Sequence, residues 1–427
     1  MNQWAVSGER WARGPRRMGA CRGFLPVSSS VLPGLLAIAL AGCPATGGGD
    51  VPPSGHDSDT SAPASSFLDG PEGIRVVGDR VFVTSTCAAL DDATGTMTYG
   101  PGYLSALAPE TLEETGRVDV PWLNPQTLVV IDGQPERGGE TGAPAPEVDG
   151  AGDGQGGSED GFLLAVVCSG RLESDRNGRM LAATPGGILL VRPETLAVVG
   201  QTEIPIGTPG SLGGFPGTAV FDPAGNALLA GSGIGPYVYR VSLAPPSVAD
   251  TFTVHPESET NDLVVPALAG GILYVSSQRT GLLYRLDPAS GIPVADPLDI
   301  TKTDAYEGPI DIAVTGDTLY VLATISSRVA AVDLATGQVT WPFSAGSAPN
   351  RLLFHEGMLY AVNSLDNNLT RYDPATGQRT SPFAPLPVGT NPWEIAAAGT
   401  TGYITGYLDD TVYAVSLDDG AILRTSR

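Results

Sequence analysis

The C-terminal part of the chain alternates short apolar runs with polar turns at a regular spacing. In residues 271–291, GILYVSSQRTGLLYRLDPASG, two apolar runs flank a polar turn, and a second turn closes the segment. Similar segments follow at 316–337, 356–377 and 399–420. β-branched and aromatic residues in such runs favour strands, and a strand buried on both faces has a continuously apolar sequence. The pattern therefore predicts several short strands in each repeat.

The spacing of these repeats predicts the architecture. Their closing glycines, at positions 291, 337, 377 and 420, lie 46, 40 and 43 residues apart. A period of about 40–45 residues with several strands per unit is typical of the blades of a β-propeller. We predict an all-β propeller over residues 66–427 with seven four-stranded blades; other boundaries would give six or eight. The predicted blades begin near positions 71, 124, 215, 261, 309, 350 and 391.

Asp287, Asp333 and Asp373 each end the second strand of a repeat, just before a turn that contains glycine. A carboxylate at this place accepts hydrogen bonds from backbone N–H groups two residues on, and glycine supplies the positive φ of the turn. We interpret these aspartates as turn residues rather than catalytic ones.

The amino-terminal segment has the pattern of an export signal. Five arginines precede the apolar run Val31–Leu40, which leads into Leu-Ala-Gly-Cys at 40–43. A basic region, an apolar core of about ten residues and a small-residue cleavage site are typical of a secretory signal peptide. The run is too short to span a membrane. Residues 1–42 are thus a predicted signal peptide, with Met1 or Met18 as the true start.

The Leu-Ala-Gly-Cys sequence resembles the lipobox of bacterial lipoproteins. The resemblance implies that Cys43 is acylated and becomes the first residue, and two or three acyl chains give a stable membrane anchor. Pro44 replaces the aspartate associated with retention in the inner membrane, which favours the outer membrane. Residues 43–65, rich in Gly, Pro, Ser and Asp, predict a disordered tether.

The charge of the chain restricts its partners. The formal net charge is −23, and cleavage after residue 42 leaves 18 basic and 45 acidic residues, a charge of −27. Lys302 is the only lysine. A strongly negative surface repels phosphate backbones and anionic lipid surfaces, so nucleic acid is not an expected partner.

Two cysteines remain after Cys21 leaves with the signal peptide and Cys43 takes the lipid. Cys87 and Cys168 follow comparable strands in adjacent predicted blades. An even number of cysteines in an oxidising compartment predicts a disulfide between them, with two separate buried thiols as the alternative. With only three histidines, a Cys/His zinc site and a Cys–His nucleophile pair are not expected.

The repeats from 309 onward resemble the YVTN-type propeller repeat family. The resemblance rests on a proline, a glycine, an aromatic-led strand and a Thr-Gly turn, found at Pro309, Gly316, Tyr320 and Thr336-Gly337. It implies the propeller fold but no particular activity. Residues 331–341 also resemble the tryptophan-docking motif of quinoprotein propellers. Because the comparable repeats lack the tryptophan, we interpret Trp341 as blade packing rather than as a sign of a quinone cofactor.

Three carboxylates, Glu72, Asp311 and Glu394, lie at the starts of the predicted innermost strands, which face the central channel. Together they could hold a divalent cation, as in gluconolactonase-like hydrolases; the alternative is a solvated channel mouth. Within the insertion 132–160, residues 149–160 match a calcium loop only in part, because position 3 is Ala151 and position 12 is Asp160. We interpret the insertion as disordered and acidic.

Long loops after Cys87 and Cys168 are expected over one sector of one face. Binding residues concentrate in such loops on rigid scaffolds. The candidate binding rim consists of charged residues in these loops: Asp91, Asp92, Glu173, Asp175, Arg176 and Arg179.

The sequence thus predicts a monomeric, lipid-anchored propeller of the bacterial envelope that binds or scaffolds without catalysis. The expected partner is a protein or an envelope glycan, and no cofactor is expected. The alternative is a calcium-dependent hydrolase or lactonase of the six-bladed propeller type, with Glu72, Asp311 and Glu394 as metal ligands.

Overall fold

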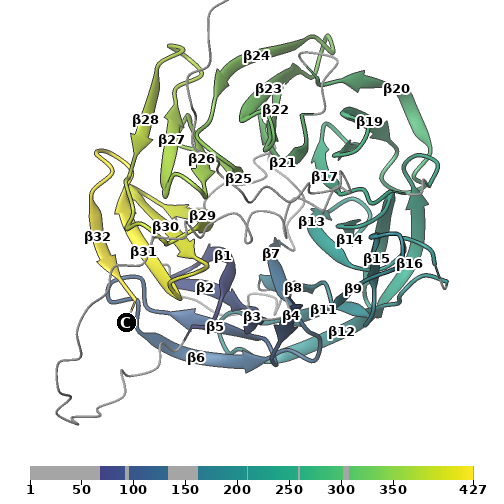
Figure 1. The fold of residues 1–427 in the computed structure, drawn as a ribbon, viewed down its shortest axis with the longest axis horizontal. Coiled ribbons are helices and arrows are strands. Elements are labelled where there is room, and N and C mark those ends of the chain that lie inside the picture. The colour runs from purple at the N-terminus through teal and green to yellow at the C-terminus, as the bar shows by residue number, and fades with distance from the viewer. Residues whose placement is uncertain are drawn as a thin grey trace, which may run out of the picture. The chain divides into compact units, whose positions relative to one another are not determined.

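A computed structural model describes residues 68–91, 96–132, 162–208, 210–257, 260–301 and 307–426 of the chain. The predicted signal peptide and tether, and nearly all of the insertion 132–160, lie outside these ranges. The described residues form seven four-stranded antiparallel sheets arranged in a ring (Figure 1). No helix occurs among them, and so no segment of the described chain forms a helix that could cross a bilayer. The predicted all-β propeller with seven blades is confirmed.

Each sheet is one blade, built from strands that follow one another in sequence. The first two blades each carry an extra two-stranded hairpin between their second and third strands. Blade 1 contains β1 (Pro71–Val77), β2 (Arg80–Ser85), β5 (Tyr103–Leu107) and β6 (Glu114–Asp119), with the hairpin β3 (Ala88–Asp91) and β4 (Thr96–Tyr99); blade 2 contains β7 (Pro125–Ile131), β8 (Leu163–Cys168), β11 (Gly186–Val191) and β12 (Val198–Ile204), with the hairpin β9 (Leu172–Ser174) and β10 (Met180–Ala182).

The remaining five blades have no inserted strands. Blade 3 contains β13 (Pro216–Asp222), β14 (Ala227–Ser232), β15 (Tyr237–Leu243) and β16 (Pro246–Thr253); blade 4 contains β17 (Val264–Ala269), β18 (Ile272–Ser277), β19 (Leu282–Leu286) and β20 (Pro293–Asp299); blade 5 contains β21 (Pro309–Thr315), β22 (Thr318–Ala323), β23 (Arg328–Asp333) and β24 (Val339–Ser344); blade 6 contains β25 (Pro349–His355), β26 (Met358–Asn363), β27 (Asn368–Tyr372) and β28 (Arg379–Phe383); and blade 7 contains β29 (Pro392–Ala398), β30 (Thr401–Gly406), β31 (Thr411–Ser416) and β32 (Ile422–Thr425).

The hydrophobic core is divided among the contacts between neighbouring blades. Seven clusters of buried side chains lie one at each contact, including the contact between blades 7 and 1. A blade is therefore covered on both faces, which explains the continuous apolar runs of its middle strands. Burying one Val or Leu stabilises the fold by about 1.5–3 kcal/mol, so each blade depends on both neighbours.

The ring closes between blades 7 and 1 without exchange of strands. At this seam the Gly70 N–H donates to Asp410 Oδ1 (2.8 Å), Thr405 Oγ1 donates to the carbonyl of Glu72 (2.9 Å), and Arg424 donates to the carbonyl of Pro109 (2.6 Å). Side-chain hydrogen bonds thus add to the apolar contact between β1 and β29.

The predicted turns are confirmed. Asp333 Oδ1 accepts the N–H of Thr336 (2.7 Å), and Asp287 and Asp373 close equivalent turns. The glycines that follow, at 291, 337 and 377, have φ between 68° and 72°. Trp341 packs between blades 4 and 5, where its Nε1–H donates to the carbonyl of Ile300 (3.4 Å). Its predicted packing role is therefore confirmed.

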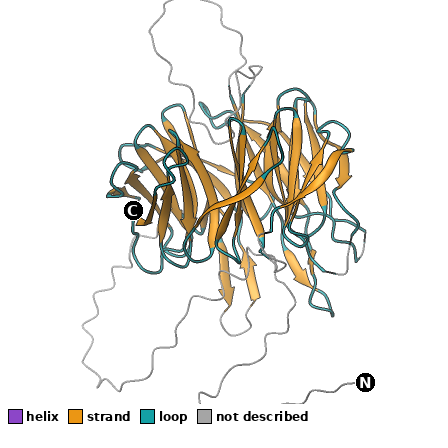
Figure 2. Cartoon of the chain, turned by 90° about the horizontal axis from the view of Figure 1, so that it is seen from above, coloured by secondary structure: helices purple, strands orange, loops and turns teal. Residues whose placement is uncertain are grey.

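The two hairpins and the starts of the innermost strands lie on one face of the ring. In every blade the innermost strand begins at the edge where the second strand ends, because the two are antiparallel. The hairpins β3–β4 and β9–β10 follow second strands and therefore lie on this face as well. We call it the hairpin face; Figure 2 shows strands projecting beyond the ring on one side.

Candidate functional site

A recurring irregularity places side chains at the mouth of the channel on the hairpin face. Six of the seven innermost strands begin with proline, and the ladder shifts register directly after it. Proline has no N–H to donate, which suits the first position of a strand. The register shift marks a β-bulge, whose extra residue is left unpaired. Charged residues of four blades occupy these bulges or directly follow them: Glu72, Asp311, Arg351 and Glu394.

These charged groups are buried and partly neutralise one another. Glu72 and Glu394 are each 4% exposed, and Arg351 is 6% exposed. Glu394 forms an ion pair with Arg75 of the neighbouring blade. Asp311 Oδ2 accepts the N–H of Leu352 from the next blade (2.7 Å). The mouth therefore links blades 5 to 6 and 7 to 1 through charged side chains.

Two carboxylate oxygens at the mouth have no hydrogen-bond partner, Glu72 Oε2 and Glu394 Oε2. Burial raises the pKa of Glu72 to about 8, with a further rise from Glu394 that Arg351 opposes. Burial also raises the pKa of Asp311 to about 6, although Arg351 and the Leu352 N–H oppose it. Glu72 is consequently protonated at neutral pH, while Asp311 is mostly ionised.

The three carboxylates that the sequence suggested as metal ligands all lie at this mouth. Glu394 is occupied by Arg75, and Asp311 by a backbone N–H. Within the described ranges, no three or more His, Cys, Asp or Glu residues are grouped as they would be around a metal ion. Calcium favours several oxygen ligands that converge without competing cations. The partial calcium loop at 149–160 lies outside the described residues.

Arg351 was not singled out from the sequence. It stands two residues after Pro349, as Asp311 stands two residues after Pro309, so alignment of the repeats would have revealed it. It lines a small cavity with Gln126, Thr218, Leu263 and Ile310, which come from blades 2 to 5. The mouth on the side of blades 2 to 5 is therefore lined by a mixture of polar and apolar side chains.

The candidate rim residues of the β9–β10 hairpin are paired within the hairpin. Arg179 Nε contacts Asp175 Oδ2 at 2.8 Å, and this hydrogen bond lowers the pKa of Asp175. Arg171 pairs with Glu173 at 2.7 Å, and Arg176 is exposed at the tip. These charges first stabilise the hairpin. In β3–β4, Asp91 ends β3 and its side chain is not described, while Asp92 lies outside the described residues.

Asn261 holds the β9–β10 hairpin against the ring, a role that the sequence did not reveal. Its Oδ1 accepts the Met180 N–H (2.8 Å) and its Nδ2 donates to the Met180 carbonyl (2.7 Å). A second bond from Nδ2 reaches the carbonyl of Ile234 (3.2 Å). One buried amide thus joins the hairpin of blade 2 to blade 3 and to the entry of blade 4.

The predicted disulfide between Cys87 and Cys168 is not formed, and both thiols are free. Cys168 ends β8 with its side chain in the core between blades 1 and 2. Cys87 lies in the loop after β2, at φ 50°, where its N–H donates to the carbonyl of Asp69. The two sulfurs belong to different surroundings because Cys87 lies two positions further along its repeat than Cys168. Burial raises the pKa of Cys87 to about 11, so its thiol stays protonated.

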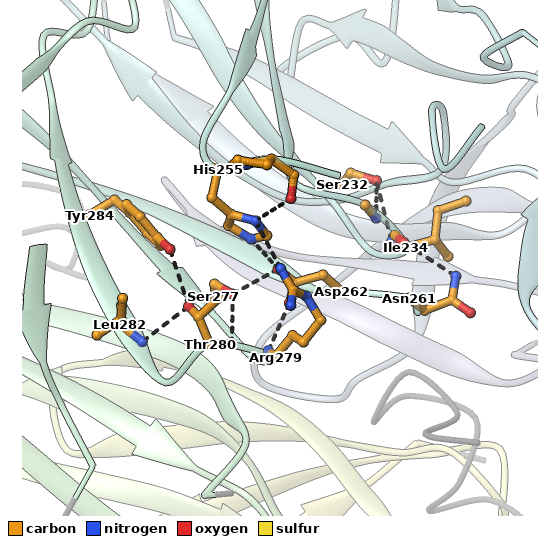
Figure 3. A network of polar contacts seen from close by, with 12 residues as sticks. Ser232, Ile234, His255, Asn261, Asp262, Ser277, Arg279, Thr280, Leu282 and Tyr284 are labelled. Atoms are coloured by element: carbon orange, nitrogen blue, oxygen red, sulfur yellow. Dashed lines mark hydrogen bonds and ion pairs between the residues drawn. The ribbon is translucent and has the colours of Figure 1, made fainter. Parts of the chain in front are cut away.

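A buried polar network at the entry of blade 4 replaces the proline and bulge that β17 lacks (Figure 3). Asp262 Oδ2 contacts His255 Nε2 (2.6 Å) and accepts Ser277 Oγ (2.7 Å), and its Oδ1 accepts the Arg279 N–H (2.8 Å). Because the serine bonds to the aspartate and not to the histidine, His255 cannot take its proton as it would in a catalytic triad. The network is a structural brace.

Comparisons with known proteins agree with the fold. Residues 299–420, most of blades 5–7, match the family model described as outer membrane protein assembly factor BamB. No curated protein sequence matches the chain. The computationally designed Ika8 protein is similar in structure, with a TM-score of 0.51 at 10% identity over 84% of this chain and 88% of that one.

Two further solved structures are similar at lower scores. Virginiamycin B lyase from Staphylococcus aureus has a TM-score of 0.48 at 13% identity, over 80% of this chain and 93% of its own. A chain of the nidogen/laminin complex has a TM-score of 0.41 at 15% identity, over 57% of this chain and 90% of its own. The chain is a seven-bladed β-propeller, and its last three blades are similar to the BamB-like, quinoprotein-type propeller repeats.

Proposed function

We propose that the protein is a lipid-anchored propeller of the bacterial envelope that binds another molecule without transforming it. In this proposal Cys43 carries the acyl chains, the outer membrane is the site of anchorage, and the hairpin face receives the ligand, a protein or an envelope glycan. The match of blades 5–7 to an outer membrane protein assembly factor supports this setting.

The observation that carries the binding role is the state of the channel mouth. Glu394 is paired with Arg75, Asp311 accepts a backbone N–H, and Glu72 is uncharged at neutral pH because burial raises its pKa to about 8. The Ser–Asp–His contacts of the described chain have the wrong order for nucleophilic attack. Two hairpins project from the same face, and Asn261 fixes one of them, β9–β10, to the ring. Projections on a rigid scaffold, beside a mouth whose charges are already matched, favour recognition over bond cleavage.

Crosslinking in living cells tests which face binds. A photo-reactive amino acid is placed at Arg176, the exposed tip of the β9–β10 hairpin, and, as controls, at Asp79 and Asp317, exposed turns on the opposite face. We expect discrete adducts from position 176 alone. Adducts from the two control positions with none from 176 would assign binding to the opposite face and reject the proposal.

Anchorage is tested by metabolic labelling with a palmitate analogue. Label is expected on the wild type and absent from the Cys43→Ser variant, which should also leave the membrane fraction. Equal labelling of both proteins would overturn the assignment of Cys43.

A metal-assisted hydrolase is the second candidate, because Glu72 Oε2 and Glu394 Oε2 lack partners. Metal analysis of the purified protein, followed by ester and lactone substrates with and without chelator, separates the two functions. Bound calcium together with chelator-sensitive turnover would favour the hydrolase; neither is expected for a binding protein.

A further inference from the structure

The tips of blades 5, 6 and 7 carry an exposed aliphatic side chain at one equivalent position. In each blade the residue's N–H donates to the carbonyl of the residue two before the first proline of the innermost strand. The three bonds are Ile325 to Glu307 (3.1 Å), Leu365 to Ser347 (3.3 Å) and Leu408 to Thr390 (3.2 Å). The three side chains are 56%, 42% and 52% exposed. The same backbone bond therefore presents the same kind of side chain three times in succession.

The other blades use this position differently. Cys87 and Gly170 occupy it in blades 1 and 2, where the chain continues into the hairpins. Ile234 is fully buried in blade 3, and blade 4 has Arg279. Among the described blades, an exposed aliphatic residue at this position is thus confined to blades 5–7, three of the five blades that lack hairpins.

Val388 extends this set. It is 98% exposed in the loop 384–391, which leads from blade 6 into blade 7. The loop is hydrogen-bonded at both ends, through Leu386 to Asn367 of the blade 6 tip (2.8 Å) and through Thr390 to Leu408 of the blade 7 tip. Across the preceding gap, Ala345 donates to Ser327 of the blade 5 tip (2.9 Å). We call Ile325, Leu365, Val388 and Leu408 the apolar arc.

The arc lies outside the seven buried clusters that pack the blades against one another, although Ile325 contacts Gly308. Its side chains face solvent, while the residues beneath them, such as Thr324 and Leu386, are buried. Single exposed aliphatic residues are common on protein surfaces, but their recurrence at the same position of three successive blades, on one face, points to a contact site. Because the loops between them are hydrogen-bonded to one another, the arc is ordered before any partner arrives, which lowers the entropy lost on binding.

The charge around the arc indicates its occupant. The loops that carry it hold one basic residue, Arg328, which pairs with Glu307. They also hold Asp366, Asp409 and Asp410, within a chain whose formal charge is −23. Such a surface repels anionic lipid and phosphate and attracts cations. We propose that the apolar arc docks a protein segment that carries aliphatic side chains beside lysine or arginine.

This inference rests on the proposed binding function and names its partner. A surface of four side chains is small, so the expected complex is weak and transient. The described chain enters the ring at Leu68–Gly70, and Gly70 bonds to Asp410 at the end of the arc. Since a membrane anchor ahead of this point would bring the arc near lipid, the experiment includes a membrane arm.

The test measures binding of two labelled peptides to the purified full-length protein by fluorescence anisotropy. One peptide is an amphipathic sequence of leucine and lysine; the other has the same leucines with glutamate for lysine. The arc variant combines Ile325→Ser, Leu365→Ser and Leu408→Ser. The control variant combines Ile292→Ser and Val294→Ser, which are 64% and 50% exposed at the outer edge of blade 4. Neither variant changes the charge.

We expect the leucine–lysine peptide to bind the wild type and the control variant equally, and to lose about tenfold or more in affinity with the arc variant. The leucine–glutamate peptide should not bind. Equal loss in both variants, no loss in the arc variant, or equal binding of the two peptides overturns the proposal. The proposal is also overturned if the arc is needed for binding to phosphatidylcholine–phosphatidylglycerol vesicles and the protein does not discriminate between the two peptides. The arc would then bind a membrane surface.

Val388→Ser provides a second variant in case the triple substitution affects folding, because this side chain contacts almost nothing. It should weaken peptide binding without changing the melting temperature. Hairpin crosslinks from Arg176 are independent of the arc. Failure of the peptide test with those crosslinks intact would reject only the arc; loss of both would reject the binding function.

Discussion

Blades 1–2 and blades 5–7 treat the same connection in opposite ways. Between the second and third strands, blades 1 and 2 insert a hairpin, whereas blades 5 to 7 keep a four-residue turn whose second residue is an exposed aliphatic one. The charged side chains described in β9–β10 mostly form ion pairs inside the hairpin. In the apolar arc the backbone N–H groups are hydrogen-bonded, but the side chains remain exposed. The first sector therefore adds folded projections beside the channel mouth, and the second leaves aliphatic side chains exposed to solvent.

The largest expected effect distinguishes a buried core leucine from an exposed arc leucine within blade 6. Leu359 is fully buried and Leu365 is 42% exposed. Leu359→Ala should lower the free energy of unfolding by about 2–5 kcal/mol, since it leaves a cavity between blades. Leu365→Ala should change it by less than about 0.5 kcal/mol. Urea denaturation measures both. A large loss from Leu365→Ala would mean that the arc serves the fold.

A second prediction concerns the mouth, where Glu72 belongs to the hairpin sector. Its pKa is about 8 in the folded protein and near 4.5 when unfolded. Below about pH 4.5 the folded and the unfolded states both bind the proton, so Glu72 does not reduce the free energy of unfolding there. As the pH rises toward 8, the unfolded state releases the proton first, so the native state loses stability.

Glu72→Gln removes this titration. The variant should therefore match the wild type below about pH 4.5 and become progressively more stable than it as the pH rises toward 8, by an amount on the order of a few kcal/mol at pH 9. Thermal unfolding across this pH range provides the measurement, with Glu110→Gln, an exposed residue, as control. A constant difference between Glu72→Gln and wild type at all pH values would contradict the assignment.

The smallest expected effect comes from loosening the β9–β10 hairpin while leaving the apolar arc unchanged. Asn261→Ala removes both bonds to Met180 and should cost about 1–2 kcal/mol of stability. Because those bonds hold β9–β10, limited proteolysis should cut near Arg176 and Arg179 faster in the variant, while the arc and its peptide binding stay unchanged. Unaltered cleavage would show that the hairpin is held by other contacts.

Much of this fold follows from the sequence because the determinants are local and repeated. The starts of the blades, the Asp–Gly turns and the packing of Trp341 each depend on patterns within a single repeat or two. The candidate site depends on pairs far apart in sequence. Glu394 meets Arg75 across the ring seam, and Asn261 meets Met180 across 81 residues. Local patterns carry no signal for such pairs.

The cysteines illustrate the same limit. Cys87 and Cys168 both lie near the ends of similar strands, which suggested a disulfide. Cys168 is still within its strand, opposite Pro125, and is buried between blades, whereas Cys87 lies two residues beyond the equivalent Ser85, in a loop. The aliphatic tips, by contrast, were present in the sequence as Ile325, Leu365 and Leu408 at matching places. The sequence does not show that these side chains are exposed, since an aliphatic residue in a repeat is normally part of the core.

The closure of the ring by side-chain bonds has a consequence for the history of the molecule. No strand is borrowed across the seam, so every blade is a continuous stretch of the chain. Duplicating or deleting such a stretch would change the number of blades without rewiring any sheet, and only the two surfaces meeting at the seam would need to fit again. Tandem copying of genes encoding one blade is therefore a direct route by which rings of this kind grow, shrink and acquire sectors with separate tasks.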